Sequence, residues 1–186
     1  MNLVHVGGPP AAGKTTVCDM LRESGFTAFD IDRDNLAVPA QDNPLHWELN
    51  VSEIAHIKEA RTEAASDNAF TFICGTVTND EKYRSLFDTR ITLVAGLAVT
   101  AYRLESRPDP TQGRAFGKDP LERTIVLERY ATRVTRAKLH DTILIDSTQP
   151  PKTVADLVVA SAFLHGNGMP ATRINAALRH YVHAND

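Results

Sequence analysis

A glycine-rich loop between an apolar run and a helix-like segment is the feature that most constrains this chain. Residues 4–20 read VHVGGPPAAGKTTVCDM, and the stretch from Gly8 to Thr15 matches G-x-x-x-x-G-K-[ST] without a mismatch. In this motif the glycines let backbone N–H groups surround phosphate oxygens, and the N-terminus of the following helix adds positive potential. Lys14 is expected to reach the β- and γ-phosphates, and the Thr15 hydroxyl to coordinate Mg²⁺. The loop therefore predicts binding of a nucleoside triphosphate.

Five short apolar runs, separated by helix-like segments, define the predicted fold. Most are continuously apolar, which favours strands buried on both faces of a parallel sheet. They are Leu3–Val6, Thr27–Ile31, Phe70–Cys74, Ile91–Val94 and Thr142–Ile145. Helices are expected over about 14–24, 52–68, 97–106 and 151–164, with others starting near 81 and after an N-cap at 119, and a last one ending near 183. This alternation predicts an α/β class. The expected architecture is a three-layer P-loop NTPase fold, with a five-stranded parallel sheet, helices on both faces and a short lid.

The composition favours a small anionic ligand over a polymer. The 186 residues are enough for a single compact domain. A net charge of −3 and a pI near 6.2 argue against a nucleic acid polymer as partner, which usually needs a basic face. Cys18 and Cys74 lack metal-type spacing and indicate free thiols in a reducing compartment. No apolar stretch approaches the ~20 residues of a membrane span. We therefore expect a cytoplasmic protein without a membrane partner, as a monomer or a homodimer.

Two carboxylates after the second apolar run are the predicted chemical centre. The third run, AFTFICGTVTND, lacks the acidic end of a Walker B strand, and an acidic pair appears instead in TAFDIDRDN. Asp30 and Asp32 are two residues apart, so on an extended segment they would both face the phosphate crevice. One would orient Mg²⁺ and its waters, and the other would accept a proton from an acceptor hydroxyl. The alternative is a pair of turn carboxylates that cap the next segment.

The order of motifs along the chain resembles a known superfamily. The glycine loop is followed by F-D-I-D, by a C-G-x-x-x-N strand end, by R-L-x-x-R at the start of an irregular loop, and by a strand ending in D-S-T-Q-P-P. Over about residues 2–164, this order resembles the small-molecule kinases of the nucleoside monophosphate kinase superfamily, such as shikimate kinase, gluconate kinase and nucleoside-kinase-like P-loop proteins. The resemblance implies a single P-loop kinase domain over residues 1–186 that uses ATP and Mg²⁺.

The resemblance also implies roles for the catalytic residues. Asp30 would lie beside the metal together with Thr15, and Asp32 would bind the acceptor hydroxyl and act as base, with the exchange of these two roles left open. Lys14, Arg107 and Arg114 would stabilise the transferring phosphoryl group. The two arginines belong to a lid over about 107–119, in which Lys118 is a further candidate; a solvated charged loop is the alternative.

The residues implied to hold the nucleotide come from three segments. Those of the glycine loop would hold the phosphates, those of R-L-x-x-R would contact the nucleotide, and the loop after the last strand would lie beside the adenine. They are Gly8, Ala11, Ala12, Gly13, Lys14, Thr15, Thr16, Arg103, Arg107, Gln149 and Pro150.

The acceptor-binding region is expected over about residues 35–68, with further residues from the segments around it. Trp47 would stack on a ring of the acceptor or serve as a core anchor, two interpretations of equal weight. The acceptor-side candidates are Asp32, Trp47, Thr76, Asn79, Arg84 and Arg133. The glycine pair of shikimate kinases is missing after the third strand, which argues against shikimate. The tail over 166–186 receives no predicted role.

The sequence thus predicts an ATP- and Mg²⁺-dependent phosphotransferase. The transfer would be to a hydroxyl or phosphate of a small molecule, such as a nucleoside, a nucleotide or a shikimate- or gluconate-like metabolite. The rival hypothesis is a P-loop ATPase or nucleotide-dependent switch that acts on a protein partner, in which the irregular loop after Arg107 would bind that partner. The absence of an N-K-x-D motif argues against a GTPase.

Overall fold

The computed structural model describes residues 2–42, 46–64, 70–77, 80–107, 117, 119–139 and 141–183. Five parallel strands form the central sheet, in the order β2-β5-β1-β6-β7. Their bounds are β1 (Asn2–Gly7), β2 (Thr27–Asp30), β5 (Phe70–Cys74), β6 (Thr89–Val94) and β7 (Ile143–Asp146). All five coincide with the predicted strands to within two residues, so the predicted parallel sheet is confirmed.

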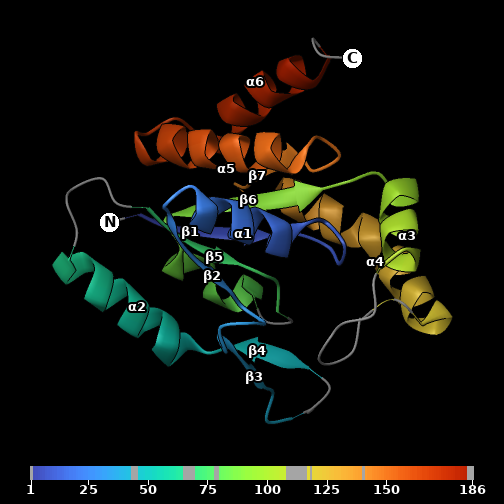
Figure 1. Cartoon of the computed structure of the whole chain (residues 1–186), viewed down its shortest axis with the longest axis horizontal. Coiled ribbons are helices and arrows are strands. Elements are labelled where there is room, and N and C mark those ends of the chain that lie inside the picture. The colour runs from blue at the N-terminus through green and yellow to red at the C-terminus, as the bar shows by residue number, and fades with distance from the viewer. Residues whose placement is uncertain are drawn as a thin grey trace.

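Helices cover both faces of this sheet, as predicted (Figure 1). They are α1 (Lys14–Glu23), α2 (Val51–Ala64), α3 (Leu97–Glu105), α4 (Pro120–Leu139), α5 (Pro151–Gly166) and α6 (Ala171–His183), with the 3₁₀ helix η1 (Asp80–Leu86). Asp119 caps α4 as expected, because its Oδ1 accepts hydrogen bonds from the N–H groups of Leu121 (2.9 Å) and Glu122 (3.3 Å). The predicted helix from residue 81 is the short η1, and the predicted extension of α2 to residue 68 lies outside the described residues.

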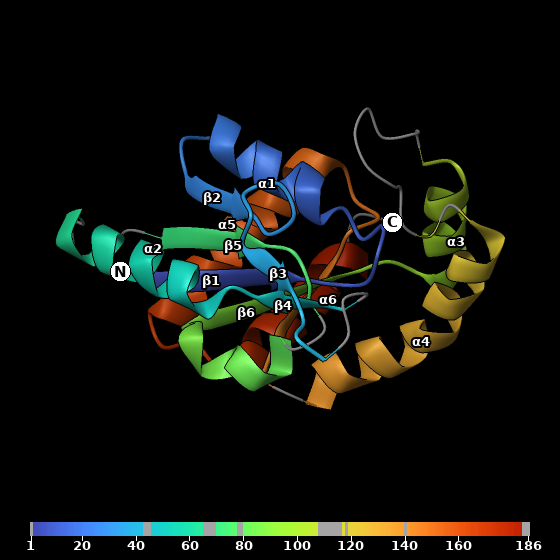
Figure 2. The ribbon, with the colours of Figure 1, turned by 90° about the horizontal axis from the view of Figure 1, so that it is seen from below.

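Two apolar cores hold the layers together. On one face, α1 and α5 pack on the sheet through buried side chains such as Val17, Leu21 and Val158. On the other face, Ile54 of α2 and Phe87, just after η1, join a smaller core. Seen from below, α3 and α4 lie together at the side of the molecule where β6 ends (Figure 2). The carboxyl ends of the strands are therefore bordered by the glycine loop, α3 and the segment after β2.

An unpredicted β-hairpin follows β2. Its strands β3 (Ala37–Pro39) and β4 (Trp47–Leu49) pair antiparallel, with Pro39 opposite Trp47. Three residues a strand are too few to show an alternating pattern, and the proline argues against a strand in the sequence. The hairpin occupies the first part of the region predicted to bind the acceptor.

The C-terminal helix α6 completes the open edge of the sheet. β7 is the last strand in the sheet order, so one row of its backbone polar groups has no neighbouring strand. Asn175 of α6 supplies partners for it: its side-chain oxygen accepts a hydrogen bond from the N–H of Leu144 (2.7 Å), and its side-chain amide donates to the carbonyl of Thr142 (2.9 Å). The tail without a predicted role therefore protects the edge strand.

Among the described residues, no helix combines the length and the apolar character that crossing a membrane requires.

Candidate functional site

The glycine loop connects β1 to α1 and has a conformation that its residue types explain. Gly8 has a φ of +146°, and a Cβ at this position would lie 2.5 Å from the backbone oxygen of Leu93, so a larger residue does not fit. Gly13, with a φ of +88°, is the N-cap of α1 and offers no side-chain cap. The first turn of α1 contains no acidic residue. The N–H groups at this helix end are thus left for an anion.

Lys14 lies across this loop in the structure. Its ammonium donates hydrogen bonds to the carbonyls of Gly8 (3.1 Å) and Pro9 (2.9 Å). Thr15 and Thr16 follow it in the first turn of α1. Within the loop, Ala12 is buried and Ala11 adopts a left-handed φ of 62°. These are the residues that the motif predicts around nucleotide phosphates.

The end of β5 is joined to the glycine loop by side chains. The Thr76 hydroxyl accepts a hydrogen bond from the N–H of Gly8 (3.1 Å) and donates one to the carbonyl of the same residue (3.0 Å). Nε2 of the buried His5 lies 3.0 Å from the carbonyl oxygen of Gly75. Burial, and secondarily the charge of Arg90, lowers the pKa of His5 to about 4. His5 is therefore neutral at pH 7 and donates from Nε2.

Arg103 connects the glycine loop to the loop after β7. From α3, its guanidinium donates to the carbonyl of Ser147 (2.8 Å) and to that of Ala11 (3.4 Å). Ser147 also donates its hydroxyl to the carbonyl of Val94 (3.1 Å). Gln149 and Pro150, predicted beside the adenine, follow in the same loop and lead into α5. Arg103 thus joins the two segments predicted to hold the two ends of the nucleotide.

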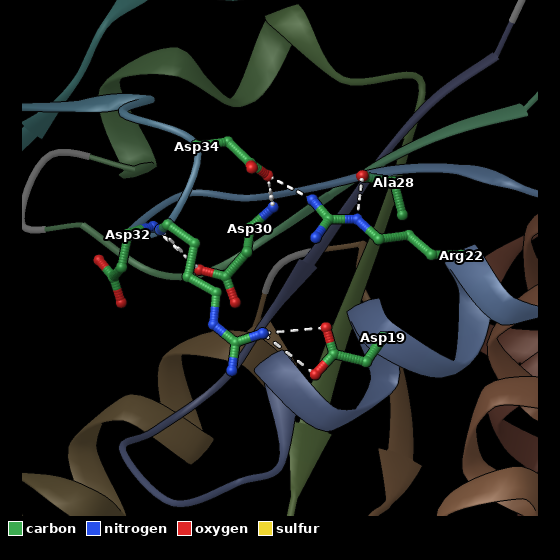
Figure 3. A network of polar contacts seen from close by, with 7 residues as sticks. Asp19, Arg22, Ala28, Asp30, Asp32 and Asp34 are labelled. Atoms are coloured by element: carbon green, nitrogen blue, oxygen red, sulfur yellow. Dashed lines mark hydrogen bonds and ion pairs between the residues drawn. The ribbon is translucent and has the colours of Figure 1, made fainter. Parts of the chain in front are cut away.

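Asp30 ends β2 and Asp32 lies in the tight turn that follows, so the expectation that both share one face of an extended segment is wrong (Figure 3). Asp30 is the last residue of β2 and is 2% exposed. Its Oδ1 accepts hydrogen bonds from the N–H groups of Asp32 (3.0 Å) and Arg33 (3.2 Å). Because the side chain of Asp30 accepts hydrogen bonds from these nearby N–H groups, the chain turns directly after the strand.

A second carboxylate holds this turn from the other side. Asp34 accepts a hydrogen bond from the N–H of Asp30 (2.6 Å) and forms an ion pair with Arg22 of α1, whose Nε donates to the carbonyl of Ala28 (2.9 Å; Figure 3). Arg33 pairs with Asp19, also on α1, at 3.0 Å. The turn is therefore fixed to the same helix that begins at the glycine loop.

The carboxyl of Asp32 has an electrostatic environment suited to a base. Asp32 is an exposed residue, yet partial withdrawal of its carboxyl from water raises its pKa, and the charge of Asp30 raises the pKa further. The charges of Lys14 and Arg107 act in the opposite direction. Three of the other predicted catalytic residues, Lys14, Asp30 and Arg107, thus lie within electrostatic reach of Asp32.

The predicted acceptor-side residues are more scattered. Trp47 is 52% exposed on the hairpin, so the core-anchor interpretation does not apply. Arg84 of η1 pairs with Glu81 at 3.4 Å, and Arg90 of β6 approaches the other oxygen of Glu81 at 3.7 Å. Asn79, Arg114 and Lys118, and the side chain of Arg133, lie outside the described part of the chain.

Cys74, at the end of β5 close to the glycine loop, is not arranged as a nucleophile. Cys18 and Cys74 are both buried and free of disulfides, and each thiol influences the pKa of the other. The adjacent Cys18 thiol, together with burial, raises the pKa of Cys74 well above its usual value, whereas the adjacent Cys74 thiol lowers the pKa of Cys18. The thiol of Cys74 is therefore protonated at pH 7 and unreactive.

Several site residues have no sequence signal of their own. The bridging role of Arg103 depends on carbonyls, which every residue possesses. His5 lies within an apolar run, where the sequence does not distinguish it from an ordinary strand residue. Asp34 did have a signal, because DIDRD places three carboxylates at alternate positions, and an aspartate at a strand end typically accepts backbone hydrogen bonds.

The comparisons with known proteins agree with this fold. An unliganded sugar kinase from Janibacter sp. HTCC2649 is 19% identical, with a TM-score of 0.55 over 88% of this chain and 94% of that one. A gluconokinase from Sinorhizobium meliloti 1021 is 18% identical, with a TM-score of 0.51 over 90% and 98%. Shikimate kinase from Aquifex aeolicus vf5 is 17% identical, with a TM-score of 0.50 over 90% and 99%. No protein-family model and no curated protein sequence matches the chain. The chain thus has the fold of P-loop small-molecule kinases, as the motif order predicts.

Proposed function

We propose that this protein is an ATP- and Mg²⁺-dependent kinase that transfers the γ-phosphoryl group to a hydroxyl or phosphate of a small molecule. The observation that supports this best is the position of Asp32. Its carboxyl has a raised pKa and lies within electrostatic reach of Lys14 and Arg107, at the end of the sheet where the glycine loop would hold the phosphates. A P-loop that served binding alone would need no such base.

The donor atoms fit Mg²⁺. The Thr15 hydroxyl and the Asp30 carboxylate are hard oxygen ligands, and the described residues contain no group of three metal-binding side chains. Mg²⁺ in kinases is typically held by one or two protein oxygens together with phosphates and water. Two backbone N–H groups fix the orientation of the Asp30 carboxylate, whereas Asp32 is exposed and open to an acceptor. We therefore assign Asp30 and Thr15 to the metal and Asp32 to the acceptor.

The proposed reaction is a direct transfer. The acceptor oxygen attacks the γ-phosphorus, its proton passes to the Asp32 carboxylate, and the bond from the γ-phosphorus to the bridging oxygen breaks to release ADP. Lys14 and Arg107 would stabilise the charge on the transferring group, joined by Arg114 of the predicted lid over 107–119. Closure of this lid would keep water from hydrolysing ATP.

The acceptor would bind between the Asp32 turn and the hairpin. Trp47 on the hairpin and Arg84 on η1 are its proposed contacts, with Asn79 and Arg133 as further candidates. Sugar acids, polyols, nucleosides and nucleoside monophosphates all offer the hydroxyl or phosphate that the reaction needs. We further propose that the chain acts as one domain in the cytoplasm, as a monomer or homodimer without a nucleic acid partner.

The test is ADP formation with Mg²⁺ and a panel of these acceptors, run in parallel with Lys14→Ala. We expect a low ADP background that one class of acceptor increases, and no increase in the variant. A background that no small molecule changes but that a protein partner alters would instead support the rival ATPase or switch. Full activity of Lys14→Ala would contradict the assignment of the glycine loop.

A further inference from the structure

We propose that Thr76 is a positioning residue for the phosphate-binding loop rather than a contact for the acceptor. The inference rests on the proposed nucleotide binding and assigns to Thr76 a function in it. Thr76 lies two residues beyond the end of β5, yet its hydroxyl makes both of its hydrogen bonds to Gly8, the first glycine of the loop.

The pairing of β1 with β5 explains why a hydroxyl is needed there. Val6 is opposite Cys74, and the carbonyl of Val6 accepts a hydrogen bond from the N–H of Gly75 (3.0 Å). If the parallel ladder continued, the N–H of Gly8 would donate to the carbonyl of Gly75, and the carbonyl of Gly8 would accept from the N–H of Val77. The strands separate at this point so that the loop can begin.

One hydroxyl replaces both of these backbone partners. The carbonyl of Gly75 has His5 Nε2 at 3.0 Å instead, and the Thr76 hydroxyl both accepts from the N–H and donates to the carbonyl of Gly8. A hydroxyl can accept and donate through a single atom, which a thiol of similar size does only weakly. Thr76 therefore ends the sheet without leaving the polar groups of Gly8 unpaired.

The same contact bears on the release of Lys14. The carbonyl of Gly8 accepts from the Lys14 ammonium (3.1 Å) and from Thr76 (3.0 Å) at the same time. When Lys14 turns towards bound phosphates, Thr76 continues to satisfy this carbonyl. Without the hydroxyl, the departure of Lys14 would leave the carbonyl without this donor, which disfavours nucleotide binding. Thr76 thus keeps the loop in place in both states.

The experiment compares Thr76→Val, which removes the hydroxyl at nearly constant shape, with Thr76→Ser, which retains it. Thr172→Val, an exposed threonine of α6, is the matched control. Two measurements are made on each: the exchange rate of the Gly8 amide proton by NMR without nucleotide, and the dissociation constant for ATP by calorimetry. For Thr76→Val we expect faster exchange and affinity weakened roughly tenfold. Thr76→Ser is expected to keep the exchange rate and the ATP affinity close to those of the wild type, and the control variant should change neither.

The two measurements separate the possible failures. Unchanged exchange at Gly8 in Thr76→Val would overturn the proposed contact, whatever the protein binds. Faster exchange with unchanged ATP affinity, or equal loss of affinity in the serine and valine variants, would show that the hydroxyl does not position the loop for nucleotide. Steady-state kinetics with an acceptor from the panel would add a third outcome: a raised KM for the acceptor alone would return Thr76 to the acceptor site. Wild-type protein that binds no ATP would refute the proposed function, while the exchange data would still report on the contact.

Discussion

The carboxylate of Asp30 accepts a hydrogen bond from the backbone N–H of Asp32 at 3.0 Å, so the first aspartate determines where the second can lie. Asp30 is buried at the end of its strand, and Asp32 is presented on the turn that Asp30 closes. Two carboxylates of the same type thereby acquire different surroundings. This difference is the physical basis for assigning one to the metal and the other to proton transfer.

We predict that Asp32→Asn lowers kcat for phosphoryl transfer by about 10²–10⁴-fold, since an amide cannot accept the proton of the acceptor. The dissociation constant for ATP should stay within about twofold, because Asp32 faces the acceptor in our assignment. Steady-state kinetics together with nucleotide titration measure both quantities. Asp156→Asn, on the exposed surface of α5, is the control and should change neither. A variant that lost only ATP affinity would show that Asp32 serves the nucleotide.

The same variant should be more stable than the wild type at pH 7. The pKa of Asp32 is raised in the folded protein, so its stabilising contribution is present at low pH and is lost as the pH rises through the folded pKa. Above that pH the charged carboxylate opposes folding, and the neutral amide does not. Urea denaturation at pH 7 and at pH 4 should show a gain in the free energy of unfolding that is larger at pH 7. An equal gain at both pH values would mean that charge is not the cause.

We predict that Arg107→Gln shifts the acidic limb of the kcat/KM profile to higher pH. The positive charge of Arg107 lowers the pKa of Asp32, so its removal raises that pKa. Asp32 must be deprotonated to act as base, and activity is therefore lost at a higher pH as the solution is acidified. Arg107→Lys retains the charge and should keep the limb near its wild-type position. If both variants shifted the acidic limb by the same amount, the geometry of the Arg107 side chain, and not its charge, would be the cause.

Arg103→Ala should weaken ATP binding about tenfold or more. The guanidinium holds the carbonyls of Ala11 and Ser147 together, and both carbonyls lose a charged hydrogen-bond donor when it is removed. Arg129→Ala, an exposed arginine of α4, removes the same charge away from this bridge and should leave the affinity unchanged. Calorimetric titration measures the affinity for ATP in both variants. Equal losses of affinity would mean that the net charge of the protein, and not the bridge made by Arg103, explains the effect.

Asn175→Ala should destabilise the fold by about 1–3 kcal/mol, because it leaves the carbonyl of Thr142, just before β7, and the N–H of Leu144 in β7 without their side-chain partner. Arg179→Ala on the same helix is exposed and should cost far less. Urea denaturation curves give both values. A small effect at Asn175 would mean that water replaces the amide at this edge.

The sequence was most informative where the chemistry lies in consecutive residues. The glycine loop from Gly8 to Thr15 and the buried strands were predictable because a short local pattern determines each one. The contact of Thr76 with Gly8 was not, since it joins residues 68 positions apart and uses a side chain that the sequence also allowed at the acceptor. The turn at Asp32 was misjudged because the side chain of Asp30, and not strand propensity, fixes its backbone.

The hairpin and the C-terminal helix show a second limit. Strands β3 and β4 are stabilised by pairing with each other, and three residues each carry too little pattern to predict that pairing. The role of Asn175 depends on which strand forms the sheet edge, and that is a property of the topology. Tertiary context, rather than local preference, decides both features.

The fate of the γ-phosphate tests the central claim most directly. ATP labelled at the γ-position would be incubated with the protein, Mg²⁺ and the acceptor panel, and the label followed into products. Our account predicts that the label enters an organic phosphate, with one phosphorylated acceptor formed for each ADP. It also predicts that Asp32→Asn slows this transfer by about 10²–10⁴-fold while still binding ATP. If the label appeared only as inorganic phosphate, at a rate that no acceptor changed, the result would contradict kinase activity and support the rival ATPase.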